Sequence, residues 1–580
     1  MNLALTLAAS IAVLALGYRV WGRLAARWAG VDPARPTPAV TRSDGRDFVP
    51  TRGPVLLGHH FASIAAAGPI IGPTLALGYG WAPALLWILL GVVLIGATHD
   101  FLALFLSVRE GGRSIAEIAR RTLGTTGFVL FVAFALVLCI MVVAAFLDLT
   151  AVALTSTYAL SDLALPADQT LLRTVDRGGV PHGMLGGIAS TSVIVITALA
   201  PLVGWLLARR RAPLLLVSLL AVGICGASVA VGFAAPLAMD PKVWMFVLLA
   251  YALAAGAIPV WLVLQPRDFV NVHLLYVGMA AMIAGILSAG LQGATIDAPP
   301  IAGGDVAGAL GAMWPFLFVT IACGSVSGAH ALIAGGTTSK QIASEAHLRP
   351  IGYGGMLLEA LLGVSVLLII LGGIGFDRYS AIVWPHDEHG VLGKGNAPLA
   401  FAAGVGGILD RGFGLPAVFG TVFGILLLEG FLVTTIDTIV RLQRYLVEEL
   451  WEVAWPTRPR LLRSPLVNTA LPLVPCVWLA FTRGYTAIWP IFGSANQLLA
   501  ALTLVTASFW LYRHGRRWGW AAWPAAFMVM TTLGSLVTLT WRHVVAGQAA
   551  LATADLVLLG LSGGVVWIVA RRLRAHVAAA

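Results

Sequence analysis

Residues 58–74 read Gly58-His59-His60-Phe61-Ala62-Ser63-Ile64-Ala65-Ala66-Ala67-Gly68-Pro69-Ile70-Ile71-Gly72-Pro73-Thr74, an apolar run that contains two Gly-Pro pairs. Proline in the interior of a helix removes a backbone hydrogen bond and clashes with the preceding turn. The two pairs therefore predict that the helix opens between Gly68 and Pro73. A structural kink is the alternative interpretation, although a kink needs only one such pair.

The composition places this run in a membrane. Only 11% of the 580 residues are charged, whereas soluble chains contain about 25%. So few charges cannot cover a soluble body of this size, which excludes a cytosolic enzyme, a secreted domain and a disordered protein. Because unpaired backbone groups cannot face lipid, the opened backbone of residues 68–73 must be buried or must line a cavity.

About fifteen apolar runs approach the roughly 20 residues that a helix needs to cross the hydrocarbon. They are residues 3–18, 55–78, 82–107, 125–156, 187–208, 212–236, 244–264, 272–291, 312–334, 353–374, 416–439, 466–481, 486–511, 519–540 and 551–570. We therefore expect an all-α polytopic membrane protein with about 15 transmembrane helices.

The basic residues indicate the orientation of these spans. If the N-terminus lies outside and each span crosses once, the inner segments hold 28 of the 36 Lys and Arg residues. Cytoplasmic loops are enriched in Lys and Arg, so the sequence predicts an outer N-terminus and an inner C-terminus. The net charge of +10 is thereby explained by orientation, and no nucleic-acid partner is expected.

A second, milder interruption is expected in the seventh span, around Gly256 and Pro259. The second and seventh spans each begin a run of five helices, with opposite orientation. Interrupted helices at matching positions of two inverted halves are typical of inverted-repeat transporters. The predicted organisation is an extra helix and basic linker at residues 1–54, repeats at 55–236 and 237–440, and additional helices at 441–580.

The interruptions predict where a substrate binds, because the N-terminus of a half-helix attracts an anionic group such as a carboxylate. In the ninth span, Ser325 and Ser327 would add hydroxyl groups, although small residues there could serve close packing alone. The candidate substrate-binding residues are Ala67, Gly68, Pro69, Gly72, Pro73, Gly256, Ser325 and Ser327.

Ionisable side chains inside spans are costly and often functional. Five of them share the inner half of their spans, which suggests a connected network: His59, His60, Asp100, His330 and Glu359. Histidine beside a carboxylate exchanges a proton near neutral pH. The candidates for proton coupling are His59, His60, Asp100, His330 and Glu429. Ordinary structural hydrogen bonding is the alternative for each of them.

Two other buried acids receive local interpretations. Asp437 and Arg441 are four residues apart and are expected to pair with each other. Asp148 lies toward the outer side and could act as a gate or cap a neighbouring helix.

No motif for an enzyme or a cofactor is recognisable. The sequence contains neither a Walker phosphate loop nor an H-E-x-x-H metal site. We therefore expect no catalytic residues, metal or cofactor, and a proton or sodium gradient as the driving force. An intramembrane enzyme and a nutrient sensor are the rival interpretations.

Several strings, in one order, resemble the carbon starvation protein A family of bacterial inner-membrane transporters over about residues 50–510. They are Gly58–Ile64 with the paired Gly-Pro that follows, Leu264–Phe269, Cys323–Gln341, Leu428–Phe431 with Thr434–Asp437, and Trp489–Leu498. The resemblance implies a leucine-transporter-like five-plus-five inverted repeat and a multi-pass protein of the inner (cytoplasmic) membrane. It also implies secondary active uptake of peptides or, in some members, of pyruvate with protons.

The combined hypothesis is a secondary active transporter that imports peptides or pyruvate-like small carboxylates during nutrient limitation. Proton coupling is favoured, and sodium coupling through Ser325 and Ser327 is the alternative. The sequence does not separate peptide from pyruvate, because both carry a carboxylate.

Overall fold

The computed structural model describes residues 1–577, apart from 45–47, 164, 209–212, 259–262, 304–309, 387–392, 394 and 456–458. The described chain forms two compact units, each assembled from three stretches of sequence. Unit 1 comprises Met1–Ala8, Val142–Pro299 and Ser365–Ala487, and unit 2 comprises Ala9–Met141, Pro300–Val364 and Ile488–Ala580. Each unit draws on both predicted repeats, and the repeat boundaries themselves stay a prediction.

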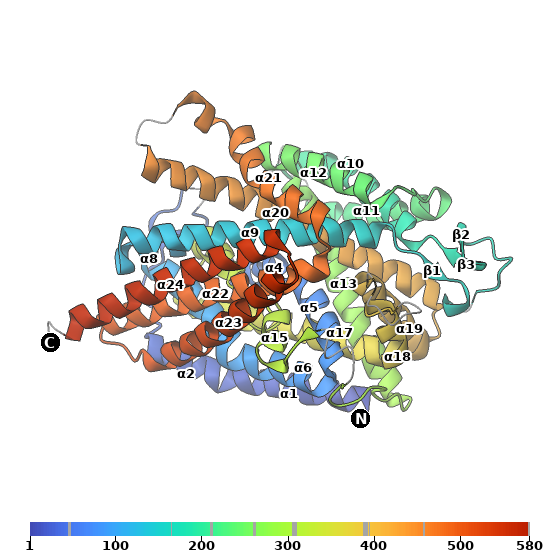
Figure 1. Cartoon of the computed structure of the whole chain (residues 1–580), viewed down its shortest axis with the longest axis horizontal. Coiled ribbons are helices and arrows are strands. Elements are labelled where there is room, and N and C mark those ends of the chain that lie inside the picture. The colour runs from blue at the N-terminus through green and yellow to red at the C-terminus, as the bar shows by residue number, and fades with distance from the viewer. Residues whose placement is uncertain are drawn as a thin grey trace. The chain divides into compact units, whose positions relative to one another are not determined.

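Unit 2 is helical throughout its described regular structure. Its helices are α2 (Trp21–Ala29), α3 (Pro38–Thr41), α4 (Gly53–Ile64), α5 (Gly68–Ala76), α6 (Trp81–Leu86), α7 (Ala97–Arg109), α8 (Ile115–Leu123), α15 (Met313–Thr320), α16 (Ala329–Gly336), α23 (Gly519–Val545) and α24 (Ala549–Val577). A π-helical stretch, Trp87–Gly96, joins α6 to α7. The last two helices lie side by side (Figure 1).

Four of the described helices have residues in both units. They are α1 (Leu3–Arg19), α9 (Thr125–Leu154), α17 (Gly354–Gly373) and α22 (Tyr485–Arg513). The remaining helices belong to unit 1: α10 (Leu185–Ala208), α11 (Leu214–Ala234), α12 (Pro241–Ala257), α13 (Leu264–Leu291), α18 (Phe376–Val383), α19 (Ala397–Phe413), α20 (Ala417–Ala454) and α21 (Pro465–Thr482).

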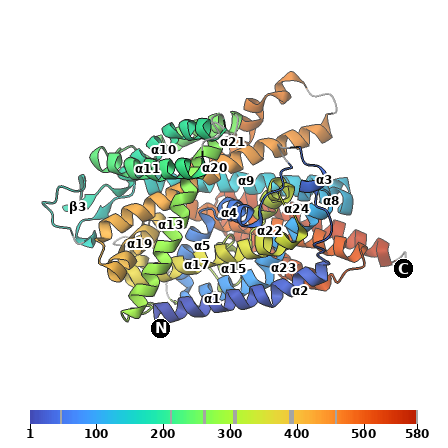
Figure 2. The same cartoon turned by 180° about the vertical axis from the view of Figure 1, so that it is seen from behind.

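The core of unit 1 includes an apolar contact among α10, α11 and α13, which are neighbours in Figure 2. Val203, Val217 and Val270 are fully buried there, one from each helix. Unit 1 also contains a small antiparallel sheet that the sequence did not indicate, visible in Figure 1. Its strands are β1 (Tyr158–Ala159), β2 (Thr174–Arg177) and β3 (Val180–Gly183), in the order β1-β3-β2.

The chain is a multi-pass membrane protein built of helices, as expected. In the described ranges, 12 helices are long and apolar enough to span a membrane, or 13 if the bent pair α4 and α5 is one span. Two other expected spans take a different form: α12 has only 17 residues, and residues 312–334 are divided between α15 and α16. The count of about fifteen and the five-plus-five repeat therefore stay predictions.

The interruption in the second span lies earlier than expected. α4 ends at Ile64 and α5 begins at Gly68, with a bend of 51° between the two segments. Pro69 occupies the first turn of α5, where its missing N–H breaks no hydrogen bond. Pro73 lies inside α5, so the second Gly-Pro pair does not open the helix. The predicted interruption of this span is therefore confirmed, although it directly precedes Gly68 instead of lying between Gly68 and Pro73.

The other clear interruption lies in the ninth span, for which the sequence analysis did not predict one. α15 ends at Thr320 and α16 begins at Ala329, with a non-helical segment between them. In the expected seventh span, α12 ends at Ala257 and α13 begins at Leu264. Pro259, which belongs to that predicted interruption, lies outside the described residues.

Candidate functional site

The two interrupted segments pack directly against each other within unit 2. A Cβ atom added at Gly72 would stand 2.8 Å from the carbonyl oxygen of Thr320, and one at Gly68 would overlap the side chain of Cys323. Glycine at these two positions lets the α5 backbone approach the end of α15. The contact therefore places the first turn of α5 beside the open segment between α15 and α16.

Helix α22 stabilises both ends of the open segment with polar side chains. Trp489 donates from Nε1 to the carbonyl of Thr320 at 3.0 Å, and Gln497 donates to that of Phe318 at 2.7 Å. These bonds satisfy terminal carbonyls of α15, which have no partner inside their own helix. On the other side, Oδ1 of Asn496 accepts a hydrogen bond of 3.0 Å from the amide of Ala329, the first residue of α16.

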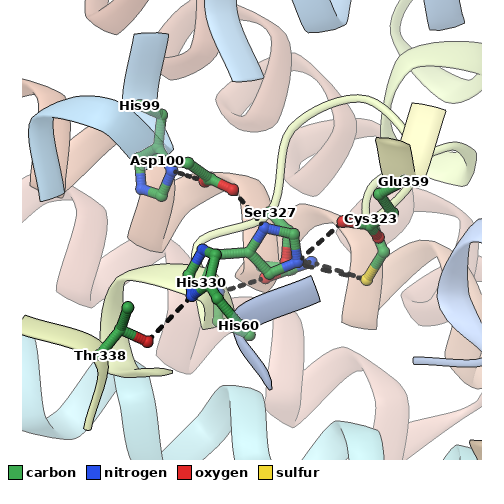
Figure 3. Close-up of polar contacts among 10 residues, drawn as sticks. His60, His99, Asp100, Cys323, Ser327, His330, Thr338 and Glu359 are labelled. Atoms are coloured by element: carbon green, nitrogen blue, oxygen red, sulfur yellow. Dashed lines mark hydrogen bonds and ion pairs between the residues drawn. The ribbon is translucent and has the colours of Figure 1, made fainter. Parts of the chain in front are cut away.

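His330, in the first turn of α16, lies between two buried carboxylates (Figure 3). Its Nδ1 atom is 2.7 Å from Oδ2 of Asp100 on α7, and its Nε2 atom is 3.3 Å from Oε2 of Glu359 on α17. We call His330, Asp100 and Glu359 the His330 cluster.

Two further histidines border this cluster (Figure 3). His99 Nδ1 is 2.8 Å from the second carboxylate oxygen of Asp100. His60 Nδ1 is 2.9 Å from the hydroxyl of Thr338. The Nε2 atoms of both histidines are buried and have no hydrogen-bond partner among the described residues.

The His330 cluster has the composition of a proton-exchange site. An imidazole gains or loses a proton near neutral pH. His330 has a neighbouring carboxyl group in either protonation state. As a cation, His330 is balanced by Asp100. Glu359 has no other hydrogen-bond donor in the described structure. Its carboxylate can therefore be balanced only by a protonated His330; otherwise the carboxyl group itself carries the proton. Burial makes these states unequal in energy, because an unpaired charge is costly away from water.

The predicted substrate-binding residues lie in different parts of the structure. The carbonyl of Ala67 accepts hydrogen bonds from the amides of Ile70 and Ile71 and so begins α5. Gly72 and Pro73 lie inside that helix. The hydroxyl of Ser325 donates to the carbonyl of Ile321, and that of Ser327 bonds with Asn496, with 3.2 Å between Oγ and Nδ2. Gly68, Pro69, Ser325 and Ser327 thus share the interrupted region, whereas Gly256 belongs to unit 1.

The predicted proton-coupling residues divide in a similar way. Asp100 and His330 are in direct contact, and His60 borders them. His59 is exposed on the surface of α4, and Glu429 lies in unit 1. Glu359 lies at the depth that the sequence indicated and touches His330, but it was not among the predicted coupling residues. Asn496 was not predicted either, although its amide is a polar group in an apolar run.

Asp437 does not pair with Arg441, contrary to the prediction from their spacing. Its Oδ2 atom instead accepts hydrogen bonds from Arg267 at 2.9 Å and from Tyr251 at 2.7 Å. Arg441 donates to the carbonyls of Ala255 and Ile258 at the end of α12. These terminal carbonyls attract a cation because they are unsatisfied within their helix.

Asp148 accepts a hydrogen bond of 2.8 Å from the amide of Tyr485, the first residue of α22. This contact agrees with the interpretation of Asp148 as a cap for a neighbouring helix.

Comparison with known proteins identifies the family. The profile described as "Carbon starvation protein CstA" matches residues 2–390 and 377–535. The chain belongs to the carbon starvation protein CstA family. The resemblance drawn from the sequence strings is thereby confirmed.

Two curated CstA-family relatives come from Escherichia coli (strain K12). The chain is 31% identical to "Peptide transporter CstA", covering 90% of this chain and 79% of that protein. It is 30% identical to "Pyruvate/proton symporter BtsT", covering 91% of this chain and 80% of that protein. Among solved structures, the Eremococcus coleocola manganese transporter aligns with a TM-score of 0.44 and 12% identity, covering 91% of this chain and 99% of that one.

These curated names establish the general activity of this CstA-family chain: it is a membrane transporter. They give no support to the rival interpretation as an intramembrane enzyme.

Proposed function

We propose that this CstA-family protein is a proton-coupled secondary transporter that imports peptides or pyruvate-like small carboxylates during nutrient limitation. The observation that carries the proposal is the position of His330, between Asp100 and Glu359 and in the first turn of a helix that begins at an interruption. The relatives named as a peptide transporter and as a pyruvate/proton symporter support the same classes of substrate. We also propose the bacterial inner membrane as its location.

The substrate carboxylate would bind where α5 and α16 begin. Both helices direct their N-terminal, positive ends toward the interrupted region, and such ends favour an anion. Glycine at position 68 lets the start of α5 lie directly against Cys323, where a larger side chain would overlap. Asn496 and Ser327 provide polar atoms at the start of α16.

The proton would reside on the His330 cluster, next to that carboxylate. With His330 protonated, its positive charge favours a bound anion, because opposite charges attract strongly away from water. Loss of the proton to the cytoplasm removes this attraction and favours release of the substrate. Proton binding and carboxylate binding would thus reinforce each other, which is the thermodynamic requirement for symport.

Uptake into proteoliposomes tests this proposal. Purified protein would be reconstituted with an alkaline interior and offered labelled pyruvate or a labelled dipeptide. We expect accumulation that follows the pH gradient and collapses with a protonophore. His330→Gln should abolish gradient-driven accumulation, whereas His59→Gln, a matched change outside the cluster, should retain it.

Other outcomes would contradict parts of the proposal. Uptake that ignores the pH gradient but follows a sodium gradient would replace proton coupling with sodium coupling. Recovery of chemically altered substrate would favour an enzyme. Competition by pyruvate, small acids and dipeptides against one labelled substrate would separate the two substrate classes.

A further inference from the structure

Unit 1 contains a second group of charged and polar side chains, which are buried or half-buried. It consists of Tyr251 on α12, Arg267 and Asp268 on α13, and Glu429 and Asp437 on α20. We call these five residues the Arg267 cluster. Arg267, Glu429 and Asp437 are at most 1% exposed.

The best-formed contact in this cluster is the ion pair between Arg267 and Asp437. Nη1 of Arg267 is 2.9 Å from Oδ2 of Asp437, and the Tyr251 hydroxyl donates to the same oxygen. The Arg267 guanidinium also lies 5.8 Å from the centre of the Tyr251 ring. Asn271, one turn after Arg267, donates to the hydroxyl of Thr434 at 3.1 Å and so joins α13 to α20 again.

The charges in the Arg267 cluster do not balance if every acid is ionised. Three carboxyl groups, on Asp268, Glu429 and Asp437, interact electrostatically with the single guanidinium of Arg267, and Asp437 alone is in direct contact with it. Arg441 also acts on Asp437, but its guanidinium donates to the α12 carbonyls. Uncompensated charge in a membrane interior is costly, so the excess is removed by binding a cation or a proton.

Glu429 is the acid least able to remain ionised. Neither of its carboxyl oxygens has a hydrogen-bond partner in the described structure, and its side chain is fully buried. Arg267 is the charged group that acts on it. The Nε atom of Arg267 is also buried and without a partner. Arg267 thus has an unused hydrogen-bond donor, and Glu429 has unused acceptors. The two side chains interact electrostatically, but no hydrogen bond joins them.

The helices packed on α20 carry few other titratable groups. Lys242 is exposed at the start of α12, and Nδ1 of His273, on α13, lies 2.7 Å from the carbonyl oxygen of Phe269. α10 and α21 contain no Asp, Glu, His, Lys or Arg, and the two charged residues of α19, Asp410 and Arg411, are exposed at its end. A proton neutralises a carboxylate without needing several oxygen ligands, and a metal cation would face repulsion from Arg267. The Arg267 cluster therefore favours a proton over a metal cation.

We infer that Glu429 is a second proton-binding site of this transporter, with Arg267 as the group that alternates between Asp437 and Glu429. When Arg267 pairs with Asp437, Glu429 holds its proton as a neutral carboxylic acid. When Arg267 turns toward Glu429, the O–H bond of Glu429 breaks, its proton passes to water, and the carboxylate pairs with the guanidinium. Asp437 then takes a proton from water, so the net charge of the cluster is the same in both states.

Infrared difference spectroscopy of the full chain in nanodiscs tests the protonation directly. A protonated carboxyl group has a C=O stretch that disappears when the group ionises or is replaced by an amide. We expect Glu429→Gln to remove one protonated-carboxyl band from the pH-difference spectrum. The matched change Glu448→Gln, on the same helix beside Arg444, should leave that band in place.

The role of Glu429 in transport rests on the proposed function. It is tested by a measurement separate from the infrared spectrum, the number of protons carried per substrate. We expect Glu429→Gln to retain exchange of labelled for unlabelled substrate but to carry fewer protons per substrate than the wild type. Glu429→Asp, which keeps a carboxyl group, should retain the infrared band in a shifted position. This second variant also shows that the site tolerates substitution.

Three results would overturn the inference. The first is a Glu429→Gln spectrum identical to that of the wild type, and the second is a carboxyl band lost on adding Na⁺ at constant pH. The third is an unchanged proton-to-substrate ratio in Glu429→Gln. If the wild type transports neither peptide nor pyruvate, the proposed function fails, while the infrared spectrum still decides the protonation of Glu429.

Discussion

The His330 cluster of unit 2 and the Arg267 cluster of unit 1 both hold buried carboxyl groups beside a base, but the two bases differ. In each, a buried base is paired with one aspartate while a glutamate in the same cluster lacks a hydrogen bond. His330 can give up its proton and become neutral. Arg267 cannot, because a guanidinium stays charged in proteins. The first cluster can therefore change its charge at the base, whereas the second can change it only at its carboxyl groups.

The comparison predicts that removing the aspartate is most harmful in unit 1. Asp437→Ala, made in a Glu429→Gln background so that Glu429 cannot replace the lost partner, leaves a buried guanidinium that cannot become neutral. We expect a loss of about 3–5 kcal/mol in the free energy of unfolding. Titration of unfolding with a denaturing detergent measures this loss. Adding Arg267→Met in the same background should recover most of it, and no recovery would show that the charge is not the cause.

The corresponding change in unit 2 should have a smaller effect. After Asp100→Ala, His330 can release its proton, so the remaining cost is that of broken hydrogen bonds, about 1–3 kcal/mol. The same detergent titration compares the two variants. Equal losses for Asp100→Ala and for Asp437→Ala in its Glu429→Gln background would contradict the distinction between the two bases.

A third, smaller contrast concerns glycines in the two units. At Gly72, an added Cβ atom meets the Thr320 carbonyl oxygen at 2.8 Å, which belongs to the backbone. At Gly256, an added Cβ atom meets side-chain atoms of Thr469 and Val440. We expect Gly72→Ala to cost about 1–3 kcal/mol and Gly256→Ala less, because side chains adjust more readily than backbone. The reverse order would show that the contact at Gly72 is loose.

Much of the architecture followed from the sequence, because a helix in lipid must be apolar along its length. The position of the first interruption did not follow accurately. Not every proline in this run breaks the helix: the first turn of α5 accommodates Pro69, and the interior of the helix contains Pro73. The second interruption was missed because Ala322–Gly328 consists mostly of small residues that also suit a continuous, closely packed helix.

The sequence predicted only those parts of the candidate site that the depth of a residue in the membrane is enough to identify. Shared depth placed Asp100, His330 and Glu359 together, and the structure shows that they touch. Depth could not distinguish His59 from His60, which point to different surroundings. Local spacing also misassigned the partner of Asp437, because the true partner, Arg267, is 170 residues away in the chain.

The cap that Asn496 provides for α16 has a consequence for biosynthesis. Ala329 leaves the ribosome 167 residues before Asn496 does. At about 5–20 residues per second, that delay is about 10–30 s. Throughout this interval the start of α16 lacks its cap, so the interrupted segment can assume its final form only after α22 has entered the membrane. A nascent chain stalled before α22 would therefore hold most of its helices in the bilayer and still be inactive.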